Sequence, residues 1–174
     1  MEEVKMELKP GDLFCSKSSG VIPWMIRAVQ WFWSTDNEAT FNHSGIILGR
    51  NGSTLEAKFR IKKYHLEELV GKQVLIVRHK QMNKIRCLSG LKAVAPMVGK
   101  FYPGWRLPLH LFKLAKFFAF GPGVCSEFTG KFMAGAGFKN IVYGITPDDL
   151  ADRWRIDRDM VIIFEGVLKK EDLP

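Results

Sequence analysis

Cys125 begins a segment whose residue types suit nucleophilic chemistry. It follows the helix-breaking run Gly-Pro-Gly at 121–123. The apolar residues after it have the spacing of one helical face: Phe128, Phe132, Met133 and Ala136. A thiol in the first turn of that helix meets unpaired N–H groups and the positive end of the helix dipole, which lower its pKa. Cys125 is therefore a candidate nucleophile, although a cysteine on an apolar helical face is, taken alone, more often a buried core residue.

A reactive thiolate needs an imidazole to hold or carry its proton and a polar group to orient that imidazole. His43 begins an apolar segment that is typical of a strand, and Glu56 follows thirteen residues later in the next predicted strand. His65 and His79 have no acidic strand partner as well placed, so we interpret them as edge or surface residues. His43 and Glu56 are the predicted partners of Cys125.

The loop between these two strands decides whether His43 and Glu56 meet. If the four residues 48–51 form the loop, Ile47 faces Gly52 and His43 lies directly opposite Glu56. A two-residue turn at Asn-Gly would instead place Ile47 opposite Glu56. In the second strand, Thr54, Glu56 and Lys58 alternate with apolar residues and share one face.

Alternation and helical spacing predict the elements that position these residues. Strands are expected at 12–16, 43–49, 53–59, 61–66, 74–79 and 160–168, and helices at 24–33, 83–98, from Cys125 to about Gly135, and from Pro147 to about Arg153. Thr146 is expected to cap the last helix. The predicted packed stripe of the helix 83–98 is Ile85, Leu88, Leu91, Val94, Ala95 and Val98, with Cys87 outside it and Pro96 at its end.

The 174 residues predict a single domain, 1–174, because no linker, repeat or low-complexity tract divides them. The three cysteines match neither a disulfide framework nor a metal knuckle, so we expect neither metal nor cofactor. The N-terminus has no apolar signal region and no uncharged run could span a bilayer, which predicts a cytoplasmic protein. The oligomeric state is left open.

Twenty-six basic and eighteen acidic residues give a formal net charge of +8, which favours polyanionic surroundings. The basic residues are spread along the chain and no nucleic-acid motif accompanies them, so solubility is the favoured explanation and an anionic membrane surface is an alternative. The tryptophan-rich helix 24–33 and the apolar segment 109–120 are interpreted as core, as walls of a substrate groove, or as lipid-contacting elements.

The order of these motifs along the chain resembles that of the permuted NlpC-type papain-like cysteine hydrolases, in which the histidine strand precedes the cysteine helix. The resemblance rests on Pro-Gly-Asp-Leu at 10–13, His-Ser-Gly-Ile-Ile at 43–47, Leu-Glu-Ala at 55–57 and Val-Cys-Ser-Glu-Phe at 124–128. It is strongest to the bacterial YiiX/YebB-like branch and more distant to lecithin–retinol acyltransferase. It implies an α+β fold, with a central antiparallel sheet or barrel of about five to six strands packed against the Cys125 helix and other helices.

The resemblance also implies the catalytic set Cys125, His43 and Glu56, as nucleophile, general base and acid, and orienting carboxylate. The expected activity is that of a cysteine peptidase, amidase, acyl hydrolase or acyltransferase, which cleaves an amide or ester through a thioester on Cys125. A peptide, a cell-wall stem peptide or an acyl-lipid is the expected substrate, and the apolar segments favour the lipid. The alternative is a non-catalytic lipid- or protein-binding module on the same scaffold.

Overall fold

The computed structural model describes residues 6–17, 40–58, 60–101, 125–138 and 146–174. The predicted helix 24–33 and the apolar segment 109–120 lie outside these residues. None of the helices in the described ranges is long and apolar enough to cross a membrane. The three cysteines are free thiols, and all of them are buried.

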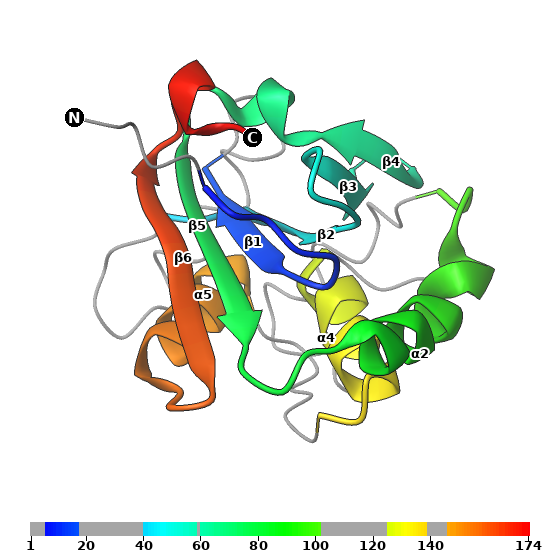
Figure 1. Ribbon diagram of the computed structural model, residues 1–174. Coiled ribbons are helices and arrows are strands. Elements are labelled where there is room, and N and C mark those ends of the chain that lie inside the picture. The colour runs from blue at the N-terminus through cyan, green and yellow to red at the C-terminus, as the bar shows by residue number, and fades with distance from the viewer. Residues whose placement is uncertain (1–5, 18–39, 59, 102–124, 139–145) are drawn as a thin grey trace.

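The described residues form one antiparallel sheet of six strands, in the spatial order β4-β3-β2-β1-β5-β6. The strands are β1 (Leu13–Ser16), β2 (His43–Ile47), β3 (Ser53–Ala57), β4 (Ile61–His65), β5 (Gln73–His79) and β6 (Met160–Val167). Within these residues β4 and β6 are the two edges, so the sheet is open and not a closed barrel (Figure 1). The predicted strand positions are confirmed to within two residues at each end.

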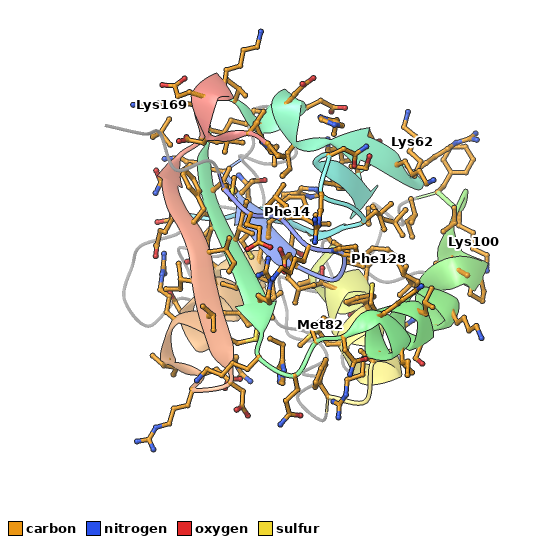
Figure 2. All side chains as sticks on the ribbon, viewed as in Figure 1. Phe14, Lys62, Met82, Lys100, Phe128 and Lys169 are labelled. Atoms are coloured by element: carbon orange, nitrogen blue, oxygen red, sulfur yellow. The ribbon has the colours of Figure 1, made fainter. Side chains whose placement is uncertain are left out.

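Three α-helices in the described residues complete the α+β fold. They are α2 (Lys84–Val94), α4 (Cys125–Gly135) and α5 (Pro147–Ile156). Short 3-10 helices are η1 (Leu66–Leu69), η2 (Ala95–Met97) and η5 (Lys170–Asp172). α2 and α4 pack side by side, and α5 lies next to β6 (Figure 1). Two apolar clusters form the interior, and Phe128 and Phe14, which Figure 2 labels, belong to one cluster each.

The predicted start of α5 is confirmed. The Thr146 hydroxyl accepts a hydrogen bond from the Asp149 N–H at 3.1 Å, and the Asp149 carboxylate accepts one from the Thr146 N–H at 3.1 Å. This reciprocal capping satisfies N–H groups that a helix end leaves unpaired. The helix continues to Ile156, three residues beyond the predicted end.

The predicted packed face of α2 is only partly confirmed, since Val94 is buried and Leu91 packs against the core, but the other predicted residues are exposed. Its buried residues are Cys87, Gly90 and Val94, whereas Ile85 is 77% exposed and Leu88 is 50% exposed. The reason is the close approach of α2 to α4. A Cβ atom at Gly90 would lie 2.7 Å from the Phe132 ring, so only glycine fits there. Apolar periodicity does not count glycine as a contact residue, and the predicted stripe therefore extended to Ile85 and Leu88 and left out Cys87 and Gly90.

Candidate functional site

His43 and Glu56 form a buried hydrogen-bonded pair. The Nε2 atom of His43 lies 2.8 Å from Oε2 of Glu56. The side chain of His43 is 9% exposed and that of Glu56 is fully buried. His43 begins β2 and Glu56 lies in β3, so the hairpin that these strands form positions both groups.

The pair forms in a register that neither predicted loop would give. Glu56 pairs with Gly45, not with His43 or Ile47. The loop has four residues, but it begins one residue later than predicted, since the Leu48 N–H donates to the Ser53 carbonyl at 2.7 Å. His43 and Glu56 are therefore diagonal neighbours, and a long side chain can bridge such a separation.

Gly45 makes this diagonal contact possible. A Cβ atom at this position would lie 2.9 Å from Cγ of Glu56 and 2.7 Å from the ring of Phe14. Because glycine has no side chain, Glu56 can lie over the backbone at Gly45 and reach the His43 ring. Gly45 was present in the motif His-Ser-Gly-Ile-Ile, but its role in placing the carboxylate was not predicted.

Two more side chains hold the Glu56 carboxylate. The Thr54 hydroxyl donates to Oε1 at 2.5 Å, and Lys58 Nζ lies 3.1 Å from Oε2. Thr54 and Glu56 share one face of β3, as the sequence predicted, and Lys58 directly follows the strand. Burial raises the pKa of Glu56, but hydrogen bonding and charge from His43, with help from Thr54 and Lys58, outweigh it and lower that pKa overall. Glu56 is therefore held as a carboxylate.

The thiol of Cys125 lies on the other side of the imidazole. Hydrogen bonding to the His43 side chain and to the backbone at Ser44 and Ser126 lowers the pKa of this thiol. Because Nε2 of His43 faces Glu56, Nδ1 is the ring nitrogen available to the sulfur. The structure thus brings together all three residues that the sequence singled out.

The electrostatics of the pair favour a thiolate beside an imidazolium. Burial alone raises the pKa of Cys125, but the hydrogen bond and charge of His43 and the two backbone donors lower it overall. Burial alone lowers the pKa of His43, but the hydrogen bonds to Cys125 and Glu56 raise it to about 9. Each group therefore stabilises the charged form of the other.

Packing of α4 against β2 fixes the position of the thiol. The hydroxyls of Ser44 and Thr129 lie 3.2 Å apart, and the Thr129 hydroxyl donates to the Cys125 carbonyl at 3.0 Å. Phe128 and Phe132 are fully buried in the cluster between the helices and the sheet. The predicted apolar stripe thus anchors the helix that carries Cys125.

The other cysteines and histidines have different surroundings. Burial raises the pKa of the Cys15 thiol well above its ordinary value, and the pKa of Cys87 is also raised by burial. His79 stacks on Phe138 with ring centroids 3.7 Å apart, and burial lowers its pKa. The prediction that His79 is a surface residue is wrong, since it is only 8% exposed. His65 is partly exposed and accepts a weak hydrogen bond from the Glu67 N–H, at the edge of the sheet.

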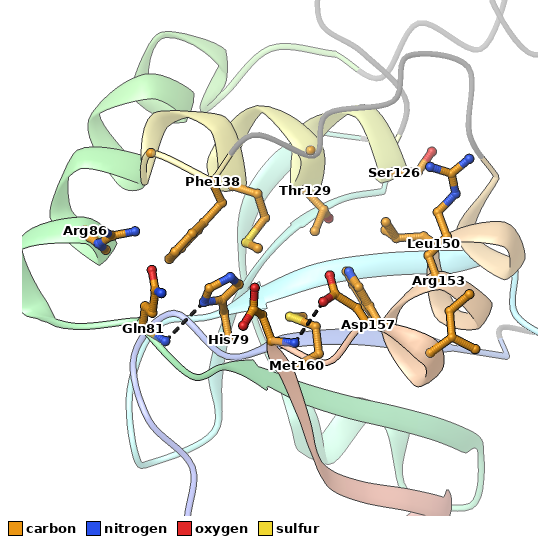
Figure 3. Close-up of a pocket in the computed structure, with 16 residues that line it drawn as sticks. His79, Gln81, Arg86, Ser126, Thr129, Phe138, Leu150, Arg153, Asp157 and Met160 are labelled. Carbon is orange, nitrogen blue, oxygen red and sulfur yellow. Dashed lines mark hydrogen bonds between the residues drawn. The ribbon is translucent and has the colours of Figure 1, made fainter.

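A pocket of about 580 Å³ is lined partly by α4, the helix that carries Cys125 (Figure 3). Its wall on α4 includes Ser126, Thr129 and Met133, and α5 contributes Leu150 and Trp154. Neither Cys125 nor His43 is among its lining residues, but it begins at Ser126, directly after the thiol. The pocket therefore adjoins the thiol along α4 and does not contain it.

The comparisons with known proteins bear on the fold. No family model and no curated protein matches the sequence. Among solved structures, the chain is similar to the crystal structure of the metalloprotein YiiX (DUF1105) from Escherichia coli O157:H7. The TM-score is 0.62 at 13% sequence identity, and the similarity covers 93% of this chain and 99% of that one.

The description of YiiX as a metalloprotein raises the question of a metal site. Among the described residues of the present chain, no group of three or more His, Cys, Asp and Glu side chains is arranged to hold a metal ion. Glu56 is already engaged by His43, Thr54 and Lys58. These residues therefore do not fit a metal centre, and the similarity to solved structures shows that the chain has a YiiX-like fold.

Proposed function

We propose that this protein is a cysteine-dependent acyl hydrolase or acyltransferase. Cys125 is the nucleophile, His43 the general base and acid, and Glu56 the carboxylate that orients the imidazole. One observation carries the proposal: the His43 ring bonds Glu56 through Nε2 and forms a hydrogen bond with the Cys125 thiol, which heads a helix. A nucleophile, a base and an orienting group in this order are the parts that acyl transfer requires.

In the first half-reaction, the Cys125 thiolate attacks the carbonyl carbon of an ester or amide. The carbonyl electron pair moves onto oxygen, where the backbone N–H of Cys125 at the head of α4 can stabilise it. As the tetrahedral species collapses, the bond to the leaving group breaks and the His43 imidazolium protonates the departing alcohol or amine. A thioester on Cys125 remains.

In the second half-reaction, neutral His43 removes a proton from water or from another acceptor. The resulting nucleophile attacks the thioester, the Cys125 thiolate leaves, and the proton stays on the imidazole. Glu56 keeps the ring in place in both halves and stabilises the imidazolium. The cycle therefore returns the thiolate–imidazolium pair with which it began.

The substrate class within this proposal is an acyl-lipid, a peptide or a cell-wall stem peptide. The pocket that begins at Ser126 has a volume of about 580 Å³, within the range of pockets that hold small molecules. Its wall is mixed: Met133, Leu150 and Trp154 suit an apolar group of the substrate, and charged residues such as Arg153 and Asp157 also line it. We therefore propose that part of the substrate occupies this pocket, and we favour an acyl chain.

The test compares the three thiols of one molecule. The intact protein is treated with iodoacetamide at neutral pH, and the modified peptides are quantified by mass spectrometry over time. Cys125 is expected to react faster than Cys15 and Cys87, whose pKa values burial raises. Cys87 is the matched control, because it is 4% exposed and Cys125 is 3% exposed. Equal rates at Cys125 and Cys87 would favour the non-catalytic binding module.

A second measurement looks for the covalent intermediate. The protein is mixed with p-nitrophenyl esters of short and long fatty acids, and release of p-nitrophenol is followed with mass analysis of the protein. An adduct equal to the acyl group is expected on Cys125 and absent from Cys125→Ala. Ester turnover that persists in Cys125→Ala would rule out the proposed nucleophile.

A further inference from the structure

The positive charge of this protein comes from one part of the chain. Residues 69–126 contain ten lysines and arginines and no aspartate or glutamate. The rest of the chain has sixteen basic and eighteen acidic residues, so it carries a small negative charge. Although basic residues occur throughout, the missing acids concentrate the positive field on the elements that this segment forms, α2 among them.

The solvent-facing side of α2 combines this charge with apolar side chains. Ile85, Leu88 and Lys92 follow one another at helical spacing, and Lys84 lies beside them. All four are exposed, and the opposite side of the helix packs against α4 through Cys87, Gly90 and Val94. Ile85 and Leu88, which look like part of a core stripe in the sequence, are therefore exposed to solvent between lysines.

The surface continues from α2 to the edge strand β4. The Ile61 N–H donates to the Lys100 carbonyl at 3.1 Å, and Phe101 forms a β-bridge with Arg60. Phe101 is 53% exposed, and the guanidinium of Arg60 lies 3.9 Å from its ring centroid. Lys62 and Lys100 both lie at the right-hand margin of the molecule in Figure 2. We call the exposed side chains Lys84, Ile85, Leu88, Lys92, Lys100 and Phe101 the α2 surface.

We propose that the α2 surface docks on a lipid bilayer that contains anionic lipids. Helices that bind at the membrane interface typically carry lysines around exposed apolar side chains. The lysines contact the anionic lipid headgroups, and the apolar side chains insert at the boundary of the acyl chains. No acidic residue occurs anywhere in the segment 69–126 to oppose that contact. Docking does not depend on Cys125.

The apolar residues favour a bilayer over nucleic acid. A nucleic acid offers phosphates to the lysines, but it gives no apolar medium to Ile85 and Leu88. A bilayer interface satisfies both kinds of side chain at once. Removal of the two apolar residues should therefore weaken binding to a bilayer and leave binding to a nucleic acid unchanged.

The experiment measures co-sedimentation of the full chain with vesicles. Cys125→Ser is used throughout, so that no turnover alters the lipid. One set of vesicles is phosphatidylcholine alone and the other contains about one quarter phosphatidylglycerol. The chain is expected to bind only the anionic set, and binding should weaken when salt is raised from about 50 to about 500 mM, because the Debye length shortens.

Two groups of variants locate the surface. The triple variant Lys84→Gln, Lys92→Gln, Lys100→Gln should weaken binding about 100-fold, since each basic residue near an anionic surface accounts for about fivefold. The double variant Ile85→Asn, Leu88→Asn should weaken it about tenfold or more. Circular dichroism checks that these variants, which change only exposed side chains, remain folded.

Matched controls change similar residues elsewhere. Ile156 is 83% exposed on α5, and Lys169 and Lys170 are exposed near the C-terminus. Ile156→Asn and the double variant Lys169→Gln, Lys170→Gln should bind anionic vesicles as the parent does. Equal losses in these controls would attribute binding to overall charge and overturn the proposal.

Two other results would also overturn it. The first is binding to duplex or single-stranded DNA that is tighter than binding to vesicles and insensitive to Ile85→Asn, Leu88→Asn. The second is a dimer in light scattering that this double variant dissociates, which would make the α2 surface a contact between two copies. Neither result would affect the reactivity test of Cys125.

Discussion

At the scale of single residues, burial opposes the charged forms of both His43 and Cys125, and their mutual interaction overcomes it. The two groups therefore titrate as a pair. Glu56 adds a third charge on the far side of the imidazole, where Thr54 and Lys58 hold it. The chemistry of the proposed site depends on this chain of contacts, and two predictions test it.

The first prediction concerns the pH dependence of alkylation at Cys125. In the parent protein the half-maximal rate should occur below pH 9.0, the ordinary pKa of the thiol, because that pKa is lowered. His43→Gln removes the hydrogen bond and charge that lower it, while burial still raises it, so the midpoint should move to higher pH. Mass spectrometry of the alkylated peptides measures both. An unchanged midpoint in His43→Gln would contradict the pairing.

The second prediction concerns Glu56→Gln, which keeps the shape of the side chain and removes its charge. The value of kcat/KM for an ester substrate should fall about 100-fold, because the imidazolium loses its stabilising carboxylate. The alkaline limb of the pH profile, expected near the His43 pKa of about 9, should also move to lower pH. A purely structural role of Glu56 would lower the rate without moving that limb.

At the scale of elements, close contacts at glycines set the geometry. Gly45 brings β3 and β2 together so that Glu56 reaches His43, and Gly90 and Gly135 bring α2 against α4. At each of these glycines the neighbouring element packs directly against the backbone. The core there is too closely packed to accommodate an added methyl group. Substitutions at these glycines should therefore be costly even though alanine is a small residue.

The third prediction is that Gly45→Ala destabilises the protein by about 1–3 kcal/mol and lowers activity. The new Cβ would lie 2.7 Å from the Phe14 ring and 2.9 Å from Cγ of Glu56, so the carboxylate must shift from His43. Gly49→Ala in the same hairpin is the control, since its nearest neighbour is the Asn51 side-chain oxygen at 3.0 Å. Urea unfolding measures the stability, and equal effects at the two positions would contradict the argument.

The fourth prediction concerns the contact between α2 and α4. A Cβ atom at Gly135 would lie 2.4 Å from Cβ of Ala93, so Gly135→Ala should destabilise by about 1–3 kcal/mol despite its better helix propensity. Ala93→Gly removes the clashing atom. The double variant should therefore lose less stability than the two single losses added together, and simple additivity in urea unfolding would show that the helices do not meet there.

At the scale of the whole molecule, the site sets part of the pH dependence of stability. Because the pKa of His43 is raised on folding, this residue stabilises the folded state below pH 6.5. That stabilisation is lost as pH rises through about 9. Because the pKa of Cys125 is lowered on folding, this residue stabilises the folded state above pH 9.0. That stabilisation is lost as pH falls through the lowered pKa of the folded protein. Where these two pH ranges overlap, the changes oppose each other, so the pair contributes little slope to the free energy of unfolding there.

The fifth prediction follows from Glu56. Its pKa is lowered from 4.5, so its contribution is complete above about pH 4.5 and is lost as pH falls through the lowered value. The free energy of unfolding in urea should fall less steeply on acidification in Glu56→Gln than in the parent. Glu171→Gln, which changes an exposed carboxylate, is the control. Parallel acid curves for all three proteins would contradict the lowered pKa of Glu56.

The local elements and the identity of the grouped side chains could be predicted from the amino-acid order alone. Caps such as Thr146, the alternation in β3 and the apolar stripe after Cys125 act over a few residues, so they can be read without knowing the fold. The order His43, Glu56, Cys125 then pointed to one chemistry. Local signals of this kind survive folding because they are satisfied within a single helix or hairpin.

The way in which those elements meet could not be predicted, because it depends on contacts that form only in the folded chain. The tertiary structure selected the register in which Gly45, and not His43, faces Glu56. It also buried Cys87 and Gly90 and left Ile85 and Leu88 in solvent. In both places a glycine allows two neighbouring elements to approach closely. Hydrophobic periodicity does not predict such a contact, because glycine contributes no side chain to the pattern.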